Sequence, residues 1–436
     1  MEEKNVRKIA LRVLDRIEAA KRYSNIALDA AINQSGVKGT DKGLLTALVY
    51  GVIEKKLTLD YQIDKMSSLP PSKIEAGVRN ALRMGLYQLI YLDRVPDHAA
   101  INESVELVNK RSKGFVNALL RSFVRGDKKI RLPEKNDFSK YLSVKYSLSE
   151  ELCTVFCREL GDVFAEEMIA AMNDLPMISL RVNTLKTDRD ELISLLCENG
   201  IVAEKTELSG VGIKLKARVA YSDIAGENEG LWFVQDEASQ ICASILGAKA
   251  GERIIDCCAC PGGKSFSIAM DMGNEGVLQS FDLHKNKLSL VREGAERLGI
   301  EIIETHEKDG RIFDPELLEF ADRILCDVPC SGLGVIAKKP DIRYKEMGDV
   351  DRLPEIQLSI AENNLKYLKK GGIMVYSTCT VLPSENEKNV QKLLERNPEL
   401  SLVPFEIGEI KSDGMLTLYP NKQGTDGFFM AKLRKN

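Results

Sequence analysis

The sequence predicts a multidomain protein with an all-helical N-terminal domain, a small α+β module and a doubly wound α/β domain. Three observations support this prediction. The chain has 436 residues, more than a single hydrophobic core usually organises. Apolar residues recur at helical spacing through residues 1–127, without an alternating strand pattern. From Gly230 onward, short apolar runs alternate with amphipathic segments, which is typical of a parallel sheet flanked by helices.

Composition and chain start indicate a soluble protein. Hydrophobic residues make up 44% of the chain and charged residues 29%, and no apolar run approaches the roughly 20 residues that span a membrane. The start, Met1 to Lys4, lacks the apolar region of a signal peptide. We therefore expect a cytoplasmic monomer that does not associate with a membrane.

Cysteine usage favours reduced thiols and argues against a metal site. Ten cysteines are spread along the chain, and Cys257 and Cys258 are adjacent, which does not suit a disulfide framework. Cys257 and Cys260 form a C-x-x-C pair, but no second such pair completes four zinc ligands. We expect no metal.

The net charge of −4 hides an uneven distribution. Residues 1–140 carry 26 Lys and Arg against 17 Asp and Glu, whereas the rest of the chain carries 35 against 48. A basic first domain indicates a polyanionic partner such as RNA. The alternative is a Lys-rich helix surface that is merely solvated.

The first domain should consist of amphipathic helices. Residues from Val6 to Ile17 repeat at helical spacing, and Ser72 is a plausible N-cap after Pro70-Pro71. Further helices are expected over residues 41–55, 72–92, 99–110 and 115–124. The last two are lined by basic residues that we expect to contact an RNA phosphate backbone, namely Lys110, Arg111, Lys113, Arg121 and Arg125.

A linker and a small mixed module should follow. Residues 128–145 are polar and interrupted by Pro133, as in a linker. The module, residues 146–229, combines expected helices with expected strands: helices over 149–160 and 190–199, and strands over 178–183 and 211–215. Spacing alone does not reveal what this module does.

The α/β domain, residues 230–436, opens with a ligand-binding turn. A strand over residues 253–259 runs into Cys260-Pro261-Gly262-Gly263-Lys264, and a helix follows from Ser265. Glycines at such a turn let a ligand approach the backbone, and the helix start offers free N–H groups. The turn matches neither the dinucleotide pattern G-x-G-x-x-G nor a complete P-loop.

Two aspartates strengthen the prediction of a nucleoside cofactor. Asp282 ends the next expected strand, where an acid accepts the ribose hydroxyls of an adenosine cofactor. Asp309 follows an expected strand over residues 301–304 and could hold the adenine amino group. Ordinary turn and capping chemistry is the alternative for both.

Two cysteines follow the expected fourth and fifth strands. Cys330 comes after Asp327 and Pro329. Cys379 lies in the segment 376–380, which follows the apolar run 372–375 and precedes a helix expected to start near Ser384. Either cysteine alone would usually be a packing residue. Together at the carboxyl edge of neighbouring strands, with Asp327 beside one of them, they predict an active site.

These motifs resemble two known families. The N-terminal blocks 93–103 and 115–121 resemble the helical RNA-binding fold of antitermination factors of the NusB type. The α/β domain resembles the RNA cytosine-5 methyltransferases that use S-adenosylmethionine. The matching residues are 258–264, Asp282, 327–332, 376–379 and 424–429. Taken whole, the chain resembles the ribosomal RNA small subunit methyltransferase B group, although Cys260 stands where that family more often has Ala.

The resemblance implies a Rossmann-like methyltransferase domain that acts on one cytidine of 16S ribosomal RNA. It assigns attack on cytosine C6 to the Cys379 thiol, release of the product to Cys330, and a hydrogen bond with the cytosine ring to Asp327. Arg181 and Asn183 of the middle module should grip RNA. The expected S-adenosylmethionine-binding residues are Cys258, Ala259, Cys260, Pro261, Gly262, Gly263, Lys264, Asp282, Asp309 and Asp327.

Three alternatives stay open on the sequence. The enzyme could act on tRNA or on another ribosomal RNA site. It could be a non-catalytic RNA-binding assembly factor, although Asp282, Asp327, Cys330 and Cys379 are all intact. A NAD-dependent oxidoreductase is disfavoured, because the dinucleotide pattern is missing.

Overall fold

The computed structural model describes residues 5–20, 24–217, 219 and 221–436. The chain divides into two compact units: unit 1 comprises residues 1–170 and 339–346, and unit 2 comprises residues 171–338 and 347–436. The predicted start without a signal peptide, Met1 to Lys4, lies outside the described residues. Within the described ranges, no helix is both long and apolar enough to cross a membrane.

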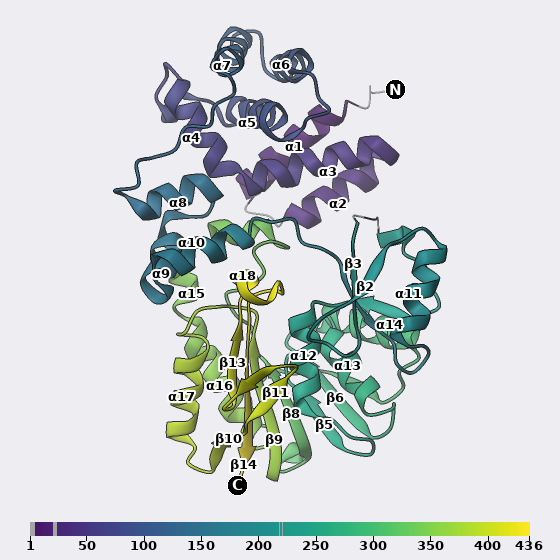
Figure 1. The fold of residues 1–436 in the computed structure, drawn as a ribbon. Helices are drawn as coiled ribbons and strands as arrows, with labels where there is room; N and C mark the ends of the chain where they lie inside the picture. The colour runs from purple at the N-terminus through teal and green to yellow at the C-terminus, as the bar shows by residue number, and fades with distance from the viewer. Residues whose placement is uncertain (1–4, 21–23, 218, 220) are drawn as a thin grey trace. The chain divides into compact units, whose positions relative to one another are not determined.

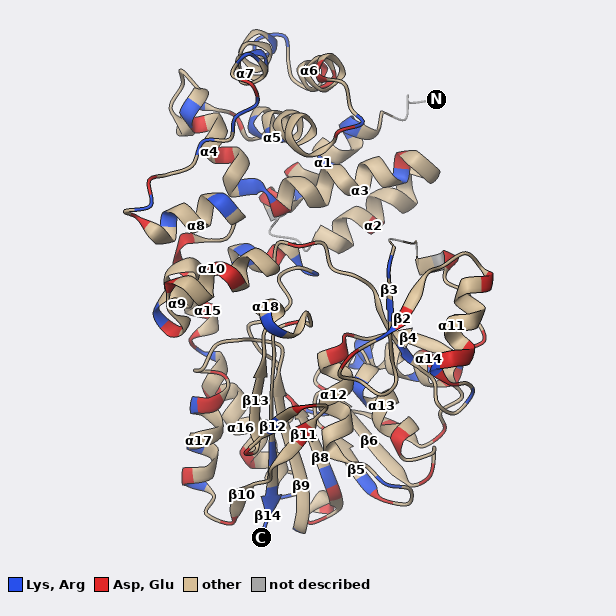
Figure 2. Ribbon diagram, in the orientation of Figure 1, with Lys and Arg blue, Asp and Glu red and all other residues tan. Residues whose placement is uncertain are grey.

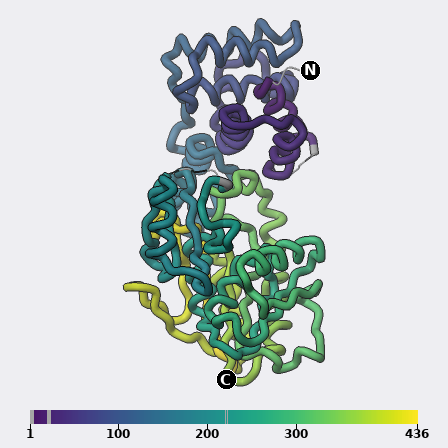
Figure 3. The backbone as a smooth tube through the Cα atoms, turned by 90° about the vertical axis from the view of Figure 1, so that its right-hand side faces the viewer, coloured from purple at the N-terminus to yellow at the C-terminus, as the bar shows by residue number. Residues whose placement is uncertain are grey.

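Unit 1 is helical, as the spacing of its apolar residues predicts (Figure 1 and Figure 3). One hydrophobic cluster of the described residues is centred on α1 to α3 and another on α4 to α7, and α5 contributes Met84 to the first and Leu86 to the second. Its helices are α1 Val6–Ala20, α2 Ser24–Ser35, α3 Gly39–Glu54, α4 Lys56–Met66, α5 Ala76–Tyr91, α6 Asp97–Glu106, α7 Lys113–Arg125, α8 Phe138–Tyr146, α9 Glu150–Leu160 and α10 Asp162–Ala171.

The predicted N-cap at Ser72 is wrong. Ser72 lies inside a short 3-10 turn, η1 Pro71–Lys73, and α5 begins after Glu75 without a side-chain cap. Between them the backbone of Ile74 is extended and its side chain is buried, so the chain buries this residue before the helix can start.

The predicted linker is wrong in its second half. Helix α8 covers Phe138–Tyr146, because Tyr141, Leu142 and Val144 bury an apolar face there and Asp137 accepts a hydrogen bond from the backbone N–H of Lys140. Helix α9 and nearly all of α10 also belong to unit 1. The helical part therefore extends about 25 residues beyond the module boundary expected at residue 146.

A short segment from the second half of the chain completes unit 1. Residues 339–346, with the 3-10 turn η5 Pro340–Tyr344, pack against α3 and its neighbours. The Tyr344 hydroxyl donates to the Ile53 carbonyl at 2.5 Å, and Asp341 accepts hydrogen bonds from the backbone and hydroxyl of Ser24. The chain thus enters unit 1 soon after the loop that carries Cys330.

Unit 2 begins with the predicted small α+β module. Its sheet has the antiparallel order β2-β3-β1-β4 and is accompanied by α11 Arg189–Glu198. Trp232, in β4, is fully buried in the core of this module, so the sheet extends just past the boundary expected at residue 229. The strands are β1 Ser179–Val182, β2 Ala203–Lys205, β3 Gly212–Leu215 and β4 Trp232–Val234.

The larger sheet of unit 2 confirms the predicted doubly wound α/β domain. Its order is β10-β14-β9-β8-β5-β6-β7, with β13 paired to β14. Strands β5 to β9 run parallel, and β14 returns antiparallel beside β9. These strands are β5 Arg253–Asp256, β6 Val277–Asp282, β7 Ile303–Glu307, β8 Ala321–Asp327, β9 Leu368–Thr378, β10 Leu400–Leu402, β13 Met415–Leu418 and β14 Phe428–Lys435, and a separate hairpin joins β11 Phe405–Ile407 to β12 Ile410–Ser412.

Helices cover both faces of this sheet (Figure 1). One hydrophobic cluster joins the sheet to α12, α13 and α14, and another joins it to α16 and α17. The helices are α12 Glu237–Leu246, α13 Gly263–Asp271, α14 Leu288–Leu298, α15 Met347–Val350, α16 Leu353–Leu365, α17 Glu387–Arg396 and α18 Pro420–Gln423. Burial on both faces explains why the central strands are nearly continuous apolar runs.

Candidate active site

The structure brings the two predicted cysteines into contact. Strands β8 and β9 are parallel neighbours with Asp327 opposite Ser377, so the loops that follow them leave the sheet side by side. The sulfur atoms of Cys330 and Cys379 lie 3.2 Å apart, both half-buried, and neither forms a disulfide. The sequence argument that parallel strand ends meet at one edge therefore holds for this pair.

The environment favours a protonated Cys330. Contact with Cys379 is the largest cause that raises the pKa of Cys330 well above its ordinary value, and burial and the charges of Glu385 and Asp327 act in the same direction. Two thiols this close cannot both ionise easily, because like charges repel strongly away from water. The pair is therefore built to hold a single negative charge.

A half-buried ion pair lies close to the thiols. The Lys264 amine lies 2.7 Å from one carboxylate oxygen of Asp327, and the Ser377 hydroxyl donates to the other at 2.8 Å. Burial is the largest single cause and acts to lower the pKa of Lys264. The charge and hydrogen bond of Asp327, together with the nearby thiols of Cys242 and Cys379, outweigh it, so this pKa is raised. A lysine that remains charged beside a thiol stabilises the thiolate.

The helix expected to start near Ser384 begins later. Helix α17 starts at Glu387, after an N-cap at Asn386, so the backbone N–H groups of its first turn come well after Cys379 in the chain. The Asn386 side chain instead supports the Cys379 loop, since it accepts from the Thr378 hydroxyl at 2.5 Å and donates to the Thr380 carbonyl at 3.0 Å. The cation that acts on Cys379 is thus Lys264, on a different element.

Two glycines let the loops approach one another. The Gly334 N–H donates to the Cys379 carbonyl, and the Gly427 N–H donates to the Gly334 carbonyl, both at 2.9 Å. A Cβ atom on Gly334 would lie 1.8 Å from the Gly427 carbonyl oxygen. Only glycine therefore fits at residue 334.

Beside Gly427, Asp426 belongs to a partly buried cluster of charges. Lys338 lies 2.8 Å from an Asp426 oxygen and 2.6 Å from an Asp236 oxygen. Burial, followed by the charge of Asp236, raises the pKa of Asp426 to about 6. The predicted motif 424–429 is thus tied by charge to the loop after Cys330.

The predicted cofactor turn lies where β5 meets α13. Gly262 is the N-cap of α13 with a φ of +115°, and a Cβ atom there would lie 2.5 Å from the Phe266 ring. No side chain caps this helix start, which leaves backbone N–H groups for a ligand. Cys258 and Cys260 are half-buried in the turn, and burial, followed by the charge of Asp282, raises the pKa of Cys260 to about 12.

The two acids predicted to hold the nucleoside lie along the same sheet edge. Asp282 ends β6, is half-buried and accepts a hydrogen bond from the backbone N–H of His284. Asp309 follows β7 and forms an ion pair with Arg311 at 2.6 Å, which lowers the pKa of Asp309. Both carboxylates can therefore accept hydrogen bonds from a nucleoside, although the Asp309 carboxylate is already paired with Arg311.

An unpartnered buried amide shows that this region suits the cofactor that the resemblance implies. The Gln235 Nε2 atom is buried without a hydrogen-bond partner, while its Oε1 accepts from the Ser267 hydroxyl at 3.0 Å. That Nε2 lies 3.6 Å from the place a Cβ atom on Gly263 would occupy. Amide and backbone donors at one end and carboxylates at the other fit the amino-acid and nucleoside ends of S-adenosylmethionine.

The sequence reasoning missed several residues of this region. Asp256 is buried at the end of β5, where it accepts from the Ser265 hydroxyl at 2.7 Å, and burial raises its pKa to about 7. Glu385, Gln235 and the Lys338 cluster were also not predicted as site residues. The only signal for them in the sequence was a charged or amide residue next to an apolar run. Such a pattern does not reveal which distant side chain that residue contacts.

The predicted RNA contacts divide into two groups. Arg111 is exposed just before α7, and Arg121 and Arg125 are exposed on it, where Figure 2 shows basic residues. Arg181 and Asn183 are buried, and their expected RNA contact is corrected. The Arg181 guanidinium pairs with Asp271 at 2.6 Å, and the Asn183 amide donates to the Gly230 and Leu298 carbonyls.

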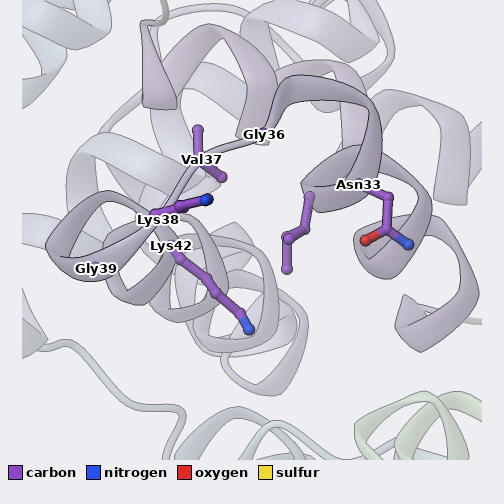
Figure 4. Close-up of a pocket in the computed structure, with 7 residues that line it drawn as sticks. Asn33, Gly36, Val37, Lys38, Gly39 and Lys42 are labelled. Atoms are coloured by element: carbon purple, nitrogen blue, oxygen red, sulfur yellow. The ribbon is translucent and has the colours of Figure 1, made fainter.

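A hollow in unit 1 is separate from the predicted site. It has a volume of about 410 Å³ between α2 and α3 and is lined in part by Asn33, Lys38 and Lys42 (Figure 4). None of the predicted catalytic or cofactor residues lines it. In the part of the chain that the structure describes, no group of three or more His, Cys, Asp or Glu side chains could hold a metal ion.

Comparisons with known proteins agree with this geometry. The family model for the 16S rRNA methyltransferase RsmB/F matches residues 243–434, the NusB family model matches residues 4–125, and a ferredoxin-like domain model of RsmF/B-like methyltransferases matches residues 154–222. The crystal structure of PH0851 superposes with a TM-score of 0.80 and 28% identity over 99% of this chain and 98% of that one.

Curated relatives match over the whole length. A Bacillus subtilis (strain 168) protein named probable ribosomal RNA small subunit methyltransferase B is 39% identical over 452 residues, covering 100% of both chains. A Synechocystis protein of the same name is 34% identical over 449 residues, covering 99% of both. Full-length identity at this level, with matching domain models, shows that the chain belongs to the RsmB/F family of 16S rRNA methyltransferases.

Proposed function

We propose that this protein methylates C5 of a cytidine in 16S ribosomal RNA with S-adenosylmethionine, through a covalent bond between Cys379 and cytosine C6. The observation that carries the proposal is the pair of thiols 3.2 Å apart beside the Lys264–Asp327 ion pair. Family membership and the names of the relatives support the ribosomal RNA substrate.

The chemistry needs a thiolate first. Cytosine C5 is a poor nucleophile, and addition of the Cys379 sulfur to C6 turns C5 into an enamine-like carbon. Lys264 stabilises the thiolate before attack. The Asp327 carboxylate accepts a hydrogen bond from a proton on ring N3, which stabilises the protonated, electron-poor form of the base as the sulfur adds. The target base must be unpaired or flipped out of its helix for the sulfur to reach C6.

The bound cofactor would supply an electrophilic methyl group on a positively charged sulfur. Residues 258–264 and the start of α13 would hold its amino-acid end together with Gln235, and Asp282 and Asp309 its nucleoside end. For release, a solvent water molecule takes the C5 proton, the electrons of that C–H bond restore the C5–C6 double bond, and the Cys379 sulfur departs as a thiolate. We assign assistance of this release to Cys330, which is in contact with the departing sulfur.

Two cysteine variants test these roles. Cys379→Ala should abolish methyl transfer to 16S ribosomal RNA, because burial and the charges of Glu385 and Asp327 still keep the remaining thiol, Cys330, protonated. Cys330→Ala should allow attack but accumulate an RNA–protein adduct that survives denaturing electrophoresis. Cys197→Ala, an exposed cysteine on α11, is the matched control and should behave like wild type. Full turnover by Cys379→Ala would refute the role assignment.

The choice of RNA is tested separately. Bisulfite sequencing of RNA from a strain that lacks the gene should show the loss of one 5-methylcytidine in 16S ribosomal RNA. Loss of a tRNA or 23S site instead would redirect the proposal to a different substrate. No loss anywhere, together with no cofactor binding by calorimetry, would favour an assembly factor.

A further inference from the structure

A buried glutamate joins the loops that carry the two thiols. Glu385 lies in the loop after Cys379 and its side chain is fully buried. One carboxylate oxygen accepts from the Ser331 hydroxyl at 2.5 Å, and the other accepts from the Ser331 backbone N–H at 2.9 Å. Burial of a carboxylate is costly unless it is well hydrogen-bonded, so these contacts hold Glu385 in one position.

The same carboxylate reaches the other side of Cys330. Gln357, on α16, donates through Nε2 to Glu385 at 2.8 Å and to the Pro329 carbonyl at 3.0 Å. Glu385 thus binds the residue after Cys330 directly and the residue before it through one amide. This arrangement fixes the Cys330 backbone where its sulfur meets Cys379.

The negative groups around Cys330 differ in whether a cation neutralises their charge. The ionisable groups that act electrostatically on its sulfur are Cys379 from the end of β9, Asp327 from the end of β8 and Glu385, and the buried Tyr376 phenol on β9 also interacts with it. Asp327 is paired with the Lys264 cation. The donors to Glu385 described above are neutral, so they stabilise its negative charge without cancelling it.

We propose that Glu385 is the positioning residue that decides which thiol attacks: it fixes the Cys330 loop and keeps Cys330 neutral, leaving Cys379 as the thiolate beside Lys264. This inference rests on the proposed function, in which one of the two thiols attacks cytosine. A neutral Cys330 can donate its S–H to the Cys379 sulfur at 3.2 Å, which further stabilises the thiolate.

The test measures the ionisation of Cys330 without any methyl transfer. In a Cys379→Ala background, the rate of Cys330 alkylation by iodoacetamide is followed from pH 6 to 11 by peptide mass spectrometry. Adding Glu385→Gln should move the midpoint of this profile down by roughly one pH unit or more, the size expected for loss of a nearby charge. Glu387→Gln, whose carboxylate accepts from the Thr417 hydroxyl on β13, is the matched control and should leave the midpoint in place.

The shape of the alkylation profile distinguishes a change in charge near Cys330 from a more mobile Cys330 loop. A loosened loop would raise the alkylation rate at high pH without moving the midpoint, and that result would overturn the proposal. Glu385→Asp keeps the charge and should hold the midpoint near that of the background protein. Where Glu385→Gln does not fold, Ser331→Ala gives the second measurement: it keeps the charge, so the midpoint should stay or rise, and a fall would overturn the proposal.

Failure of this proposal can be told apart from failure of the proposed function. The alkylation profile needs neither RNA nor cofactor, so it answers even for a protein that methylates no ribosomal RNA. Conversely, an unmoved midpoint in the Cys379→Ala background, together with RNA adduct formation by the Cys330→Ala protein, would remove Glu385 from its role and leave the methylation chemistry intact.

Discussion

Replacement of Asp256 by asparagine should remove a pH-dependent loss of stability in unit 2. Asp256 is 1% exposed, and burial raises its pKa from 3.8 to about 7. Between these values the unfolded chain releases the proton while the folded protein keeps it, so stability falls as pH rises and the loss is complete above about pH 7. Each pH unit in that window costs about 1.4 kcal/mol, which gives roughly 2–3 kcal/mol between pH 5 and pH 8.

Urea denaturation followed by Trp232 fluorescence measures this effect. Trp232 is the single tryptophan of the chain and lies buried in unit 2, so its emission reports the unfolding of that unit. As pH rises from 5 to 8, the free energy of unfolding of the Asp256→Asn protein should increase by roughly 2–3 kcal/mol relative to that of wild type. Asparagine stays neutral over this range, and its side-chain carbonyl can still accept the hydrogen bond from the Ser265 hydroxyl. A difference that stays constant within about 0.5 kcal/mol across this range would refute the reasoning.

Two further predictions concern residues whose roles only the contacts revealed. Gln235→Leu should weaken binding of S-adenosylhomocysteine roughly tenfold in calorimetry, because it removes the buried amide donor beside Gly263, and unchanged affinity would exclude Gln235 from the site. Arg181→Met should destabilise unit 2 by roughly 3 kcal/mol in the same urea assay, because it leaves the Asp271 carboxylate without its ion-pair partner. The RNA affinity of the folded protein should not change. Weaker RNA binding by a protein that is still folded would instead show that Arg181 contacts RNA.

Much of the fold followed from local pattern. Helical spacing of apolar residues predicts α1 and α3, and alternation of strands with helices predicts the order of elements from β5 to β9. The prediction failed where a local signal competed with burial. Pro133 and the surrounding charges suggested a linker, but three apolar side chains of the following segment had a core to enter and formed α8.

The sequence by itself determined that Cys330 and Cys379 share one edge of the sheet. Parallel neighbouring strands end on the same side, so two motifs that each follow a strand must meet there. The same reasoning located the Gly262 turn and Asp282, because both positions depend only on where strands stop and helices start.

Only the tertiary structure decided which charges surround the two thiols. Lys264 meets Asp327 across 63 residues of sequence, and Glu385 meets Ser331 across 54, and no periodic pattern records such pairings. Arg181 shows the same limit: the family resemblance implied an RNA contact, but burial of its guanidinium against Asp271 gives it a structural role. Residue type and spacing determine backbone direction, whereas partners and solvent exposure depend on how distant segments pack.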